Sequence, residues 1–341
     1  MKFKKVELHN VWDVIEHGKR KELGISRLPL ALHDEINRGA RNMSQLGSAC
    51  EIRGVLKRGG QARITLKAMD DNVVPATALV YRGEFLDRAV ALDIGKDVEI
   101  VIEDGKHQKT MEKVSESEDH AFHARLIRVL FPPIHPVRII SIEGDLMHPT
   151  KKFLPEKRLL CYGSSITHGA SAVFPSGTYS AQCARQLGMD LIDLGFGGAA
   201  QMDPPIAQHI ADRKDWDVAT LEMGINVRDW PPEKFQQVVK NFVGSIANAH
   251  PDKYIFCIDP FTNDRDLTGE KLEAMTTFRK VIAKVVRSQK SKKVIHVDGA
   301  KLLTDPRGLW TDLVHPNDHG MQEMGSKLAN LIRKKVPFLK P

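Results

Sequence analysis

The sequence predicts an α/β protein with two parts: an N-terminal β-sandwich of jelly-roll type and a C-terminal three-layer α/β/α domain built on a parallel five-stranded sheet. Three observations lead to this prediction. The chain has 341 residues, more than one average domain. Residues 1–150 show mainly short alternating strands. From residue 151 to residue 341, buried apolar runs alternate with helical stretches. We therefore expect an accessory domain at 1–150 and a second domain at 151–341.

The N-terminal part has the pattern of antiparallel strands. Residues 50–60 (CEIRGVLKRGG) and 62–69 (ARITLKAM) are short alternating runs on either side of a glycine-rich turn, which predicts a hairpin. Similar runs bounded by Gly, Asp or Pro follow at 73–83, 97–105 and 122–131. Strands at this spacing favour a sandwich or jelly roll. The one helix expected here spans 31–47, with Gly47 as its C-terminal cap.

The C-terminal part has the pattern of a parallel sheet covered by helices on both faces. Five apolar runs resemble fully buried strands, at 158–163, 190–196, 217–224, 254–260 and 293–299. Longer stretches with helical spacing lie between them, for example at 231–250 and 267–289. Strands and helices that alternate in this way are typical of an α/β domain. The proline-rich and charged region 135–157 is the predicted boundary between the two parts.

Composition excludes several classes of protein. The chain is 42% hydrophobic and 27% charged, which is typical of a globular protein with a buried core. No apolar run is long enough to span a bilayer, and the N-terminal residues lack the apolar core of a signal peptide, so we expect a cytoplasmic protein without a membrane partner. The net charge of +7 is dispersed, and we expect no nucleic-acid partner. Four cysteines without metal or disulfide spacing are expected to be reduced: Cys50, Cys161, Cys183 and Cys257.

Residues suited to catalysis follow three strands of the predicted sheet. In an open parallel sheet, ligands bind beyond the carboxyl ends of the strands. These ends are GSSITHG (163–169), LGFGGAAQ (194–201) and MGIN (223–226). Far downstream, the segment TDLVHPND places Asp312 three residues before His315, directly ahead of an amphipathic terminal helix. The sequence therefore predicts a site at the carboxyl edge of the sheet.

These segments match what acyl transfer requires. A serine hydroxyl becomes a good nucleophile when a neighbouring base such as histidine accepts its proton. Asp312 would fix the tautomer of His315 and stabilise its imidazolium form. The oxyanion of the tetrahedral intermediate needs preorganised donors. We expect these donors to be the backbone N–H groups of Ser165 and Gly198 and the side-chain amide of Asn226.

The first block resembles that of the SGNH (GDSL-type) hydrolases, normally Gly-Asp-Ser-Ile-Thr-x-Gly. Aligned residue by residue, it starts at Gly163, puts Ser165 on the nucleophile, and puts Ser164 in place of the usual aspartate. That aspartate is not a member of the family's triad. The Gly-x-Ser-x-Gly elbow of the α/β-hydrolases does not occur, because Thr167 stands two residues after Ser165.

The later blocks extend the resemblance over residues 158–336 in the family's order. GFGG places Gly198 on the oxyanion glycine, GIN places Asn226 on the oxyanion asparagine, and DLVH supplies Asp312 and His315. Any one block would be a weak signal, but four blocks in order are a strong one. One further departure is that GGAA lacks the polar residue often found after the oxyanion glycine.

The resemblance implies a fold, a reaction and a cofactor requirement. The fold is the flavodoxin-like parallel sheet of the SGNH hydrolases, so residues 151–341 would be the catalytic domain. The segments SRLPLAL (26–32) and LGSACEIRG (46–54) resemble the β-sandwich module that precedes this domain in some bacterial members. The family implies an esterase acting on a carbohydrate or another small molecule, without a metal or an organic cofactor. Some relatives transfer the acyl group to an acceptor other than water.

Structural explanations exist for most of these residues taken singly. GSSITHG alone is more often an ordinary turn from a strand into a helix. Asp312 could be a helix-terminal carboxylate and Asn226 a turn cap. His315 and His319 could ligate a metal, but no Glu follows as in His-Glu-x-x-His. Three neighbours of the blocks could contact substrate, although each could equally have a structural role: His168, Arg228 and Trp230.

We therefore predict a serine esterase that hydrolyses short-chain, acetyl-type O-acyl esters of a carbohydrate or small molecule through an acyl-enzyme intermediate. The alternative is an acyltransferase that uses the same Ser–His–Asp site with an acceptor other than water. A third hypothesis is a non-enzymatic binding protein on a hydrolase scaffold, which the complete set of catalytic residues disfavours. The expected partner is a small-molecule or carbohydrate ester, and assembly into a homo-oligomer stays open.

Overall fold

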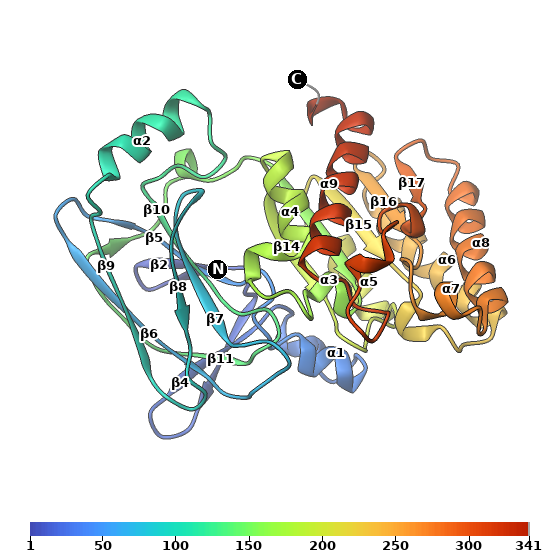
Figure 1. Cartoon of the computed structure of the whole chain (residues 1–341), viewed down its shortest axis with the longest axis horizontal. Helices are drawn as coiled ribbons and strands as arrows, with labels where there is room; N and C mark the ends of the chain where they lie inside the picture. The colour runs from blue at the N-terminus through green and yellow to red at the C-terminus, as the bar shows by residue number, and fades with distance from the viewer. Residues whose placement is uncertain (340–341) are drawn as a thin grey trace.

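The computed structural model describes residues 1–339, and it divides into an N-terminal half of antiparallel sheets and a C-terminal half with one parallel sheet between helices (Figure 1). This arrangement confirms the predicted fold class. Residues 340 and 341, the end of the predicted catalytic domain, lie outside the described residues. None of the helices in residues 1–339 has both the length and the apolar composition needed to cross a bilayer. The four cysteines are free and buried.

Two antiparallel sheets form the N-terminal half. The first has the strand order β1 (Lys2–Phe3), β2 (Val6–His9), β5 (Glu51–Leu56), β10 (Leu126–Leu130), β7 (Thr77–Arg82) and β8 (Phe85–Ala91), and β12 (Leu146–Met147) also pairs with β5. The second has the order β3 (Asp13–His17), β4 (Glu22–Ser26), β11 (Val137–Gly144), β6 (Gln61–Ala68) and β9 (Val98–Glu103). Alternating inward residues, among them Ile52 and Ile64, form one apolar core between the sheets.

The predicted hairpin over residues 50–69 is wrong. Both runs are strands, but β5 pairs with β2 and β10, whereas β6 pairs with β9 and β11 in the other sheet. All six residues of β5 are buried, as expected for a central strand. The turn after Leu56 therefore carries the chain from one sheet of the sandwich to the other.

The helices of this half also differ from the prediction. The helix expected over 31–47 is a short 3-10 turn, η1 (Leu30–Leu32), followed by α1 (Arg38–Met43). Gly47 is not the cap, because α1 ends at Ser44; the glycine is needed where the chain passes close to the carbonyl of Pro132. A second helix, α2 (Gln108–Ser117), was not predicted.

The C-terminal half follows the prediction closely. Its sheet has the order β14 (Asp190–Gly195), β13 (Arg158–Gly163), β15 (Val218–Glu222), β16 (Tyr254–Ile258) and β17 (Val294–Val297), and all pairs are parallel. Each strand lies within one of the five predicted apolar runs. The strand order, second–first–third–fourth–fifth along the chain, is that of the flavodoxin-like folds, with its switch point beside β13.

Helices cover both faces of this sheet, because successive residues of a buried strand point to opposite faces. Leu160 packs in one cluster with residues of α5 (Pro204–Asp212), α6 (Pro232–Ala249) and α8 (Leu272–Ser288). Leu159 packs in another with residues of α3 (Ser165–His168), α4 (Tyr179–Leu187) and α9 (Asp318–Lys335). The short helix α7 (Asp264–Thr268) precedes α8.

The predicted boundary region, 135–157, is only partly a connection. Strands β11 and β12 occupy most of residues 137–147, so the stretch from 148 to 157, with its 3-10 turn η2 (Lys151–Phe153), joins the sandwich to β13. The division at residue 150 stays a prediction.

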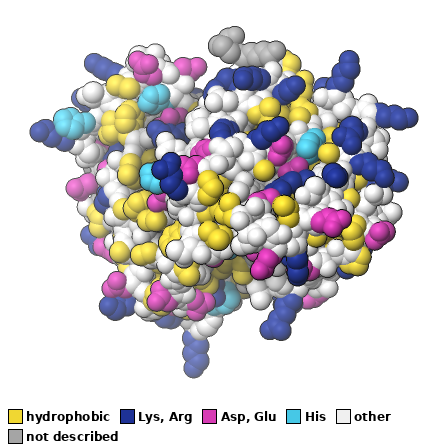
Figure 2. Space-filling model, turned by 45° about the vertical axis from the view of Figure 1, so that its right-hand side comes forward, with side chains coloured by type: hydrophobic (Ala, Val, Ile, Leu, Met, Phe, Trp, Pro, Cys, Tyr) yellow, Lys and Arg dark blue, Asp and Glu magenta, His cyan; other side chains and the backbone are white. Residues whose placement is uncertain are grey.

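On the face shown in Figure 2, basic side chains are scattered among acidic and apolar ones.

The N-terminal half covers one edge of the parallel sheet, the edge formed by strand β14. A sheet edge exposes a row of unpaired backbone groups. Here the carbonyls of every second residue of β14 accept hydrogen bonds from side chains of the other half: Leu191 from His9 (2.5 Å), Asp193 from Asn10 (3.0 Å) and Arg27 (2.8 Å), and Gly195 from Arg27 (2.8 Å). These side chains take the place that a sixth strand would occupy.

A buried ion cluster joins the two halves at the start of β14. The Arg53 guanidinium donates to both carboxylate oxygens of Asp190 (2.8 and 2.7 Å) and to Glu51 (2.8 Å). Glu51 also accepts two hydrogen bonds from Arg128. Burial alone would raise the pKa of Asp190, but the Arg53 charge outweighs burial and lowers this pKa to about 2.

Candidate active site

Ser165 lies at the carboxyl end of β13, in the turn that begins α3. Ser164 caps this helix with its side-chain oxygen, which accepts from the N–H of Ile166, and Gly169 ends it in the left-handed conformation. Gly163 has to be a glycine, because a side chain there would collide with Thr167 and Glu222. Within residues 1–339 no hydrogen-bond acceptor is found for the Ser165 N–H.

The structure brings Ser165, His315 and Asp312 into one hydrogen-bonded chain. The Ser165 Oγ lies 2.7 Å from His315 Nε2, and His315 Nδ1 lies 2.7 Å from Asp312 Oδ2. The second oxygen of Asp312 accepts the N–H groups of Val314 (2.9 Å) and His315 (3.0 Å). The carboxylate therefore holds both the backbone and the ring of the histidine in place.

The loop that carries Asp312 and His315 is fixed by the start of α9. Asn317 caps this helix with its side-chain oxygen, and its amide donates to the carbonyls of Arg307 (2.8 Å) and Leu309 (3.1 Å). The His315 carbonyl accepts the N–H of Trp310 (2.8 Å). Asp312 is 48% exposed and His315 26% exposed, so the pair lies at the surface of the site. Partial burial opposes ionisation of Asp312, but the hydrogen bonds from His315 and Val314 outweigh it and lower its pKa.

The predicted oxyanion donors lie on the neighbouring strand ends. Gly198 has φ +66°, and a side chain there would meet open space. A methyl group built on Gly197 would lie 3.6 Å from the Ser165 Cβ, which places this glycine turn against Ser165. The Asn226 oxygen accepts the Ala200 N–H (3.1 Å), so its amide nitrogen is left for another acceptor. Within residues 1–339, neither that amide nor the Gly198 N–H donates to the protein.

His168 does not face a substrate. It is only 1% exposed, and both ring nitrogens are used: Nε2 donates to the Pro133 carbonyl (3.0 Å), and Nδ1 accepts the Gly197 N–H (3.3 Å). Burial, together with the Arg27 charge, lowers its pKa well below the ordinary value, so the ring is neutral. The suggested role of His168 in substrate binding is therefore replaced by a structural one, between the N-terminal half and the glycine turn.

Arg228 and Trp230 also have contacts of their own. The Arg228 guanidinium donates to Asp264 on α7 (2.6 Å). Trp230 packs against the apolar cluster of α6 and α8, and the Lys234 ammonium lies 3.8 Å from the centre of its ring. Neither residue is joined to the triad by these contacts, and their suggested role in substrate binding stays a prediction.

Glu222, which is absent from the predicted site residues, contacts the turn that carries Ser165. It ends β15 and is 1% exposed, and one carboxyl oxygen accepts the Ser164 N–H (2.5 Å) and the Thr167 hydroxyl (3.3 Å). The other oxygen has no partner within residues 1–339. Burial raises the pKa of this carboxyl. An acidic residue inside the apolar run 217–224 was the available signal.

The alternative metal site is not supported by the geometry. Both ring nitrogens of His315 are occupied by Ser165 and Asp312. The described residues, 1–339, contain no group of three or more His, Cys, Asp or Glu side chains that could hold a metal ion. The backbone N–H of His319 donates to Asn317 in the first turn of α9.

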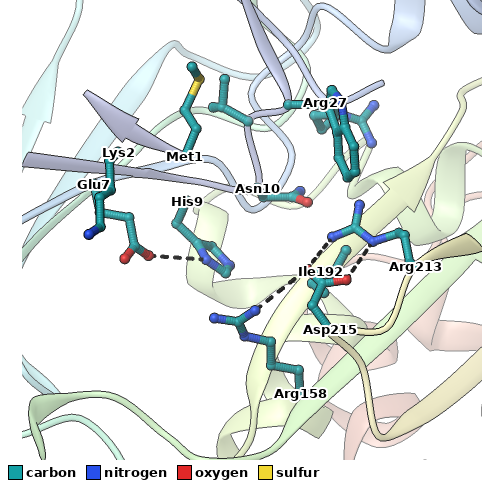
Figure 3. A pocket seen from close by; sticks show the side chains of 12 residues that line it. Met1, Lys2, Glu7, His9, Asn10, Arg27, Arg158, Ile192, Arg213 and Asp215 are labelled. Carbon is teal, nitrogen blue, oxygen red and sulfur yellow. Dashed lines mark hydrogen bonds and ion pairs between the residues drawn. The ribbon is translucent and has the colours of Figure 1, made fainter. Parts of the chain in front are cut away.

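Three cavities border both halves, and none of them is lined by Ser165, Asp312 or His315. One, of about 410 Å³, is bordered by His9 and Asn10 from the sandwich and by Arg158, Arg213 and Asp215 from the other half (Figure 3). In that view Arg158 and Arg213 both point toward Asp215. Another, of about 390 Å³, lies between β7, β10 and α4, and its wall includes Phe174, in the loop after α3, and Asp318, the first residue of α9. The third, of about 510 Å³, is bordered by Trp12 and Leu32 from the N-terminal half and by His209 of α5.

The sheet order and the four blocks at its carboxyl edge define the SGNH class of ester hydrolases. The model of the GDSL-like lipase/acylhydrolase family matches residues 156–333, more than half of the chain. The chain therefore belongs to this family, and it is an enzyme of the carboxylic ester hydrolase class. No curated protein sequence matches it.

Solved structures share the fold over most of the chain. The salicylyl-acyltransferase SsfX3 from a tetracycline biosynthetic pathway has a TM-score of 0.75 at 19% identity, over 98% of this chain and 95% of that one. A GDSL-like lipase from Bacteroides ovatus has a TM-score of 0.70 at 20% identity, over 91% of both chains. A family two carbohydrate esterase from Clostridium thermocellum, in complex with cellohexaose, has 0.60 at 16% identity, over 85% and 94%. The shared two-part architecture confirms that the N-terminal sheets belong to the fold.

Proposed function

We propose that the protein is a serine esterase that hydrolyses short O-acyl esters, of the acetyl type, on a carbohydrate or another small molecule. One observation carries the proposal: the unbroken chain from Ser165 Oγ through the His315 ring to Asp312, with 2.7 Å at each step. Distances of this size allow proton transfer without rearrangement. The cytoplasm stays its predicted location.

The reaction follows from this geometry. The Ser165 oxygen attacks the ester carbonyl carbon while its proton passes to His315 Nε2, and Asp312 stabilises the imidazolium. Collapse of the tetrahedral intermediate breaks the bond to the alcohol oxygen, which leaves with the proton from His315. Water then attacks the acyl-enzyme with His315 as the base, and the acid and free serine are formed.

The oxyanion of both intermediates would be held by the free donors around the nucleophile. These are the N–H groups of Ser165 and Gly198 and the amide nitrogen of Asn226, for which no acceptor is found within residues 1–339. Donors that are already oriented stabilise charge without reorganisation. Glycine at 198 suits the positive φ that this turn requires.

A carbohydrate ester as substrate is supported by the related structures. Several belong to family two carbohydrate esterases, and one is described as an acetyl xylan esterase. A specific observation also favours a second candidate, acyl transfer to an alcohol, because the salicylyl-acyltransferase structure superimposes over nearly the whole chain. Both candidates use the same acyl-enzyme and differ in what attacks it.

Hydrolysis of p-nitrophenyl acetate by the wild type, Ser165→Ala and Ser164→Ala tests the nucleophile. We expect a loss of about three or more orders of magnitude in kcat for Ser165→Ala alone. Wild-type activity in Ser165→Ala would reject the mechanism. A loss of activity confined to Ser164→Ala would show that Ser164, and not Ser165, is the nucleophile.

A product balance separates the esterase from the transferase. With an acetylated sugar as donor and candidate alcohols as acceptors, hydrolysis releases one equivalent of free acid for each donor consumed. Transfer consumes the donor without an equivalent of acid. A deficit of acid that grows with acceptor concentration would favour the transferase.

A further inference from the structure

The glycine turn that would hold the oxyanion is built against the N-terminal half of the chain. We call residues 196–202 the oxyanion loop. Helix α1 lies apart from the body of the sandwich, beneath the catalytic half and close to α3 (Figure 1). Several residues from Arg27 to Ser48 contact the oxyanion loop or its supports directly, although they lie 120 to 168 positions earlier in the sequence.

Asn37 makes the central polar contact. Its amide nitrogen donates to the Ala199 carbonyl in the loop (3.1 Å) and to Asp203 at the end of the loop (2.8 Å). Its backbone N–H donates to the second oxygen of Asp203 (2.9 Å). Its side-chain oxygen caps α1 by accepting the Ala40 N–H (2.9 Å). One residue therefore fixes the helix and the loop to each other.

Van der Waals contact reinforces this attachment. A methyl group built on Gly39 would lie 2.7 Å from the Ala199 Cβ, so the helix touches the loop without space for a side chain. At the other end of α1, the Met43 sulfur would lie 3.4 Å from a methyl group on Gly197, the glycine that also faces Ser165. The helix thus packs along the loop from Ala199 to Gly197.

Two further supports come from the same half. The buried Arg27 guanidinium donates to the Gly195 carbonyl (2.8 Å), directly before the loop, and lies over the Phe196 ring. Ser48 donates to the carbonyl of His168 (2.8 Å), whose ring accepts the Gly197 N–H. The N–H of Gly197 is thereby used, whereas the N–H of Gly198 has no acceptor within residues 1–339.

We propose that residues 27–48 of the N-terminal half, with α1 at their centre, position the oxyanion loop for catalysis, and that Asn37 and Gly39 are positioning residues for the Gly198 N–H. The inference rests on the proposed esterase function. It assigns the N-terminal half a part in the rate of the chemical step, in addition to any part in substrate recognition. The residues concerned act through the loop and do not touch the reacting atoms.

The test compares full-length variants in kcat, KM and Tm with p-nitrophenyl acetate. Asn37→Ser keeps a good helix cap but removes the amide donors to the loop. Gly39→Ala favours the helix by propensity but pushes against Ala199. We expect kcat to fall by about ten- to a hundred-fold in both, with KM within about threefold, since small displacements of catalytic groups cost rates of this order.

Asn10→Gly is the matched control. Asn10 also donates an amide hydrogen bond across the interface, to the Asp193 carbonyl (3.0 Å), and a second one within its own half, to the Ser48 carbonyl (2.9 Å). Its φ of +53° suits glycine. It should lower Tm and keep kcat. Wild-type kcat in Asn37→Ser and Gly39→Ala would overturn the proposal, as would an equal loss in Asn10→Gly. Gly39→Ala removes no hydrogen bond, so its kcat still tests the proposal if Asn37→Ser does not fold. Activity in Ser165→Ala would instead overturn the proposed function.

Discussion

The polar groups at the carboxyl edge of the parallel sheet differ from those along its edge strand β14 in whether they have hydrogen-bond partners. Along the side, at β14, the carbonyls of Leu191, Asp193 and Gly195 all have partners from the sandwich. At the carboxyl edge, the N–H of Gly198 and the side-chain amide nitrogen of Asn226 have no acceptor within residues 1–339. Polar groups with partners stabilise the fold, and oriented groups without partners are available to a substrate. The comparison thus separates residues for stability from residues for activity.

The largest effect is expected from Asp312→Asn at the carboxyl edge. The amide would still hold the loop but could not stabilise an imidazolium, and it would favour the wrong tautomer of His315. We expect kcat to fall by about 10³- to 10⁴-fold. Because Asp312 is 48% exposed, Tm should change little. A loss of activity matched by a large loss of stability would erase the contrast between the two regions.

The next largest effect is expected at the edge strand β14, from Arg53→Met. This change leaves the buried carboxylates of Asp190 and Glu51 without their shared cation. We expect the free energy of unfolding in urea to fall by about 3–5 kcal/mol. The kcat of the folded protein should stay within about twofold, because the cluster lies at the opposite end of β14 from the oxyanion loop. A large drop in kcat at full folding would contradict this, and adding Asp190→Asn should restore part of the stability.

Acid should first weaken the interactions at β14, where Asp190 lies. Asp190 has a folded-state pKa of about 2 against an ordinary value of 3.8, so its stabilising contribution is present above pH 4 and lost as the pH falls toward 2. The contribution is about 2 kcal/mol. Urea unfolding at pH 7 and pH 2.5 should show a smaller loss of stability on acidification for Asp190→Asn than for the wild type. Equal losses in the two proteins would show that the ion pair is not the acid-sensitive element.

The smallest effect concerns Glu222. One of its carboxyl oxygens has hydrogen-bond partners, and the other has none within residues 1–339. Its pKa is raised, so it costs stability as the pH rises above its ordinary value of 4.5 toward the folded-state value. Glu222→Gln removes this cost and keeps an acceptor for the Ser164 N–H, so it should be more stable than the wild type at pH 8, with similar kcat. Glu222→Leu leaves that N–H without a partner, at a cost of about 1–3 kcal/mol, and should lower kcat by about tenfold.

Melting curves at pH 5 and pH 8 check this prediction. The advantage of Glu222→Gln should be larger at pH 8. If Glu222→Leu retains the kcat of the wild type, the carboxyl does not hold the nucleophile turn.

The parallel sheet and the Ser–His–Asp chain were predictable from the sequence, because both leave local signals. Each buried strand is a continuous apolar run, and Asp312 and His315 are close in the sequence as well as in space. Ser165 and Asn226 follow such runs directly, at the edge where ligands bind in this class of fold.

The sandwich and the supports of the site were less predictable, because pairing and packing between distant segments leave no local pattern. Period-two alternation indicates that β5 and β6 are strands but not that a sheet-to-sheet crossing separates them. His168 looked like a substrate contact because it is close in sequence to Ser165, the predicted nucleophile; its partner Pro133 comes from the other half. The contacts of Asn37 with Ala199 and Asp203 span more than 160 residues.

The side chains along β14 also have a consequence for how the protein is made. During synthesis the N-terminal half emerges first, and domains generally fold as units in that order. We therefore expect His9, Asn10 and Arg27 to be in place before β14 leaves the ribosome. An uncovered β14 would offer its carbonyl row to strands of other nascent chains, which is a common route to aggregation. The order of the two halves along the chain would thus protect the parallel sheet while it forms.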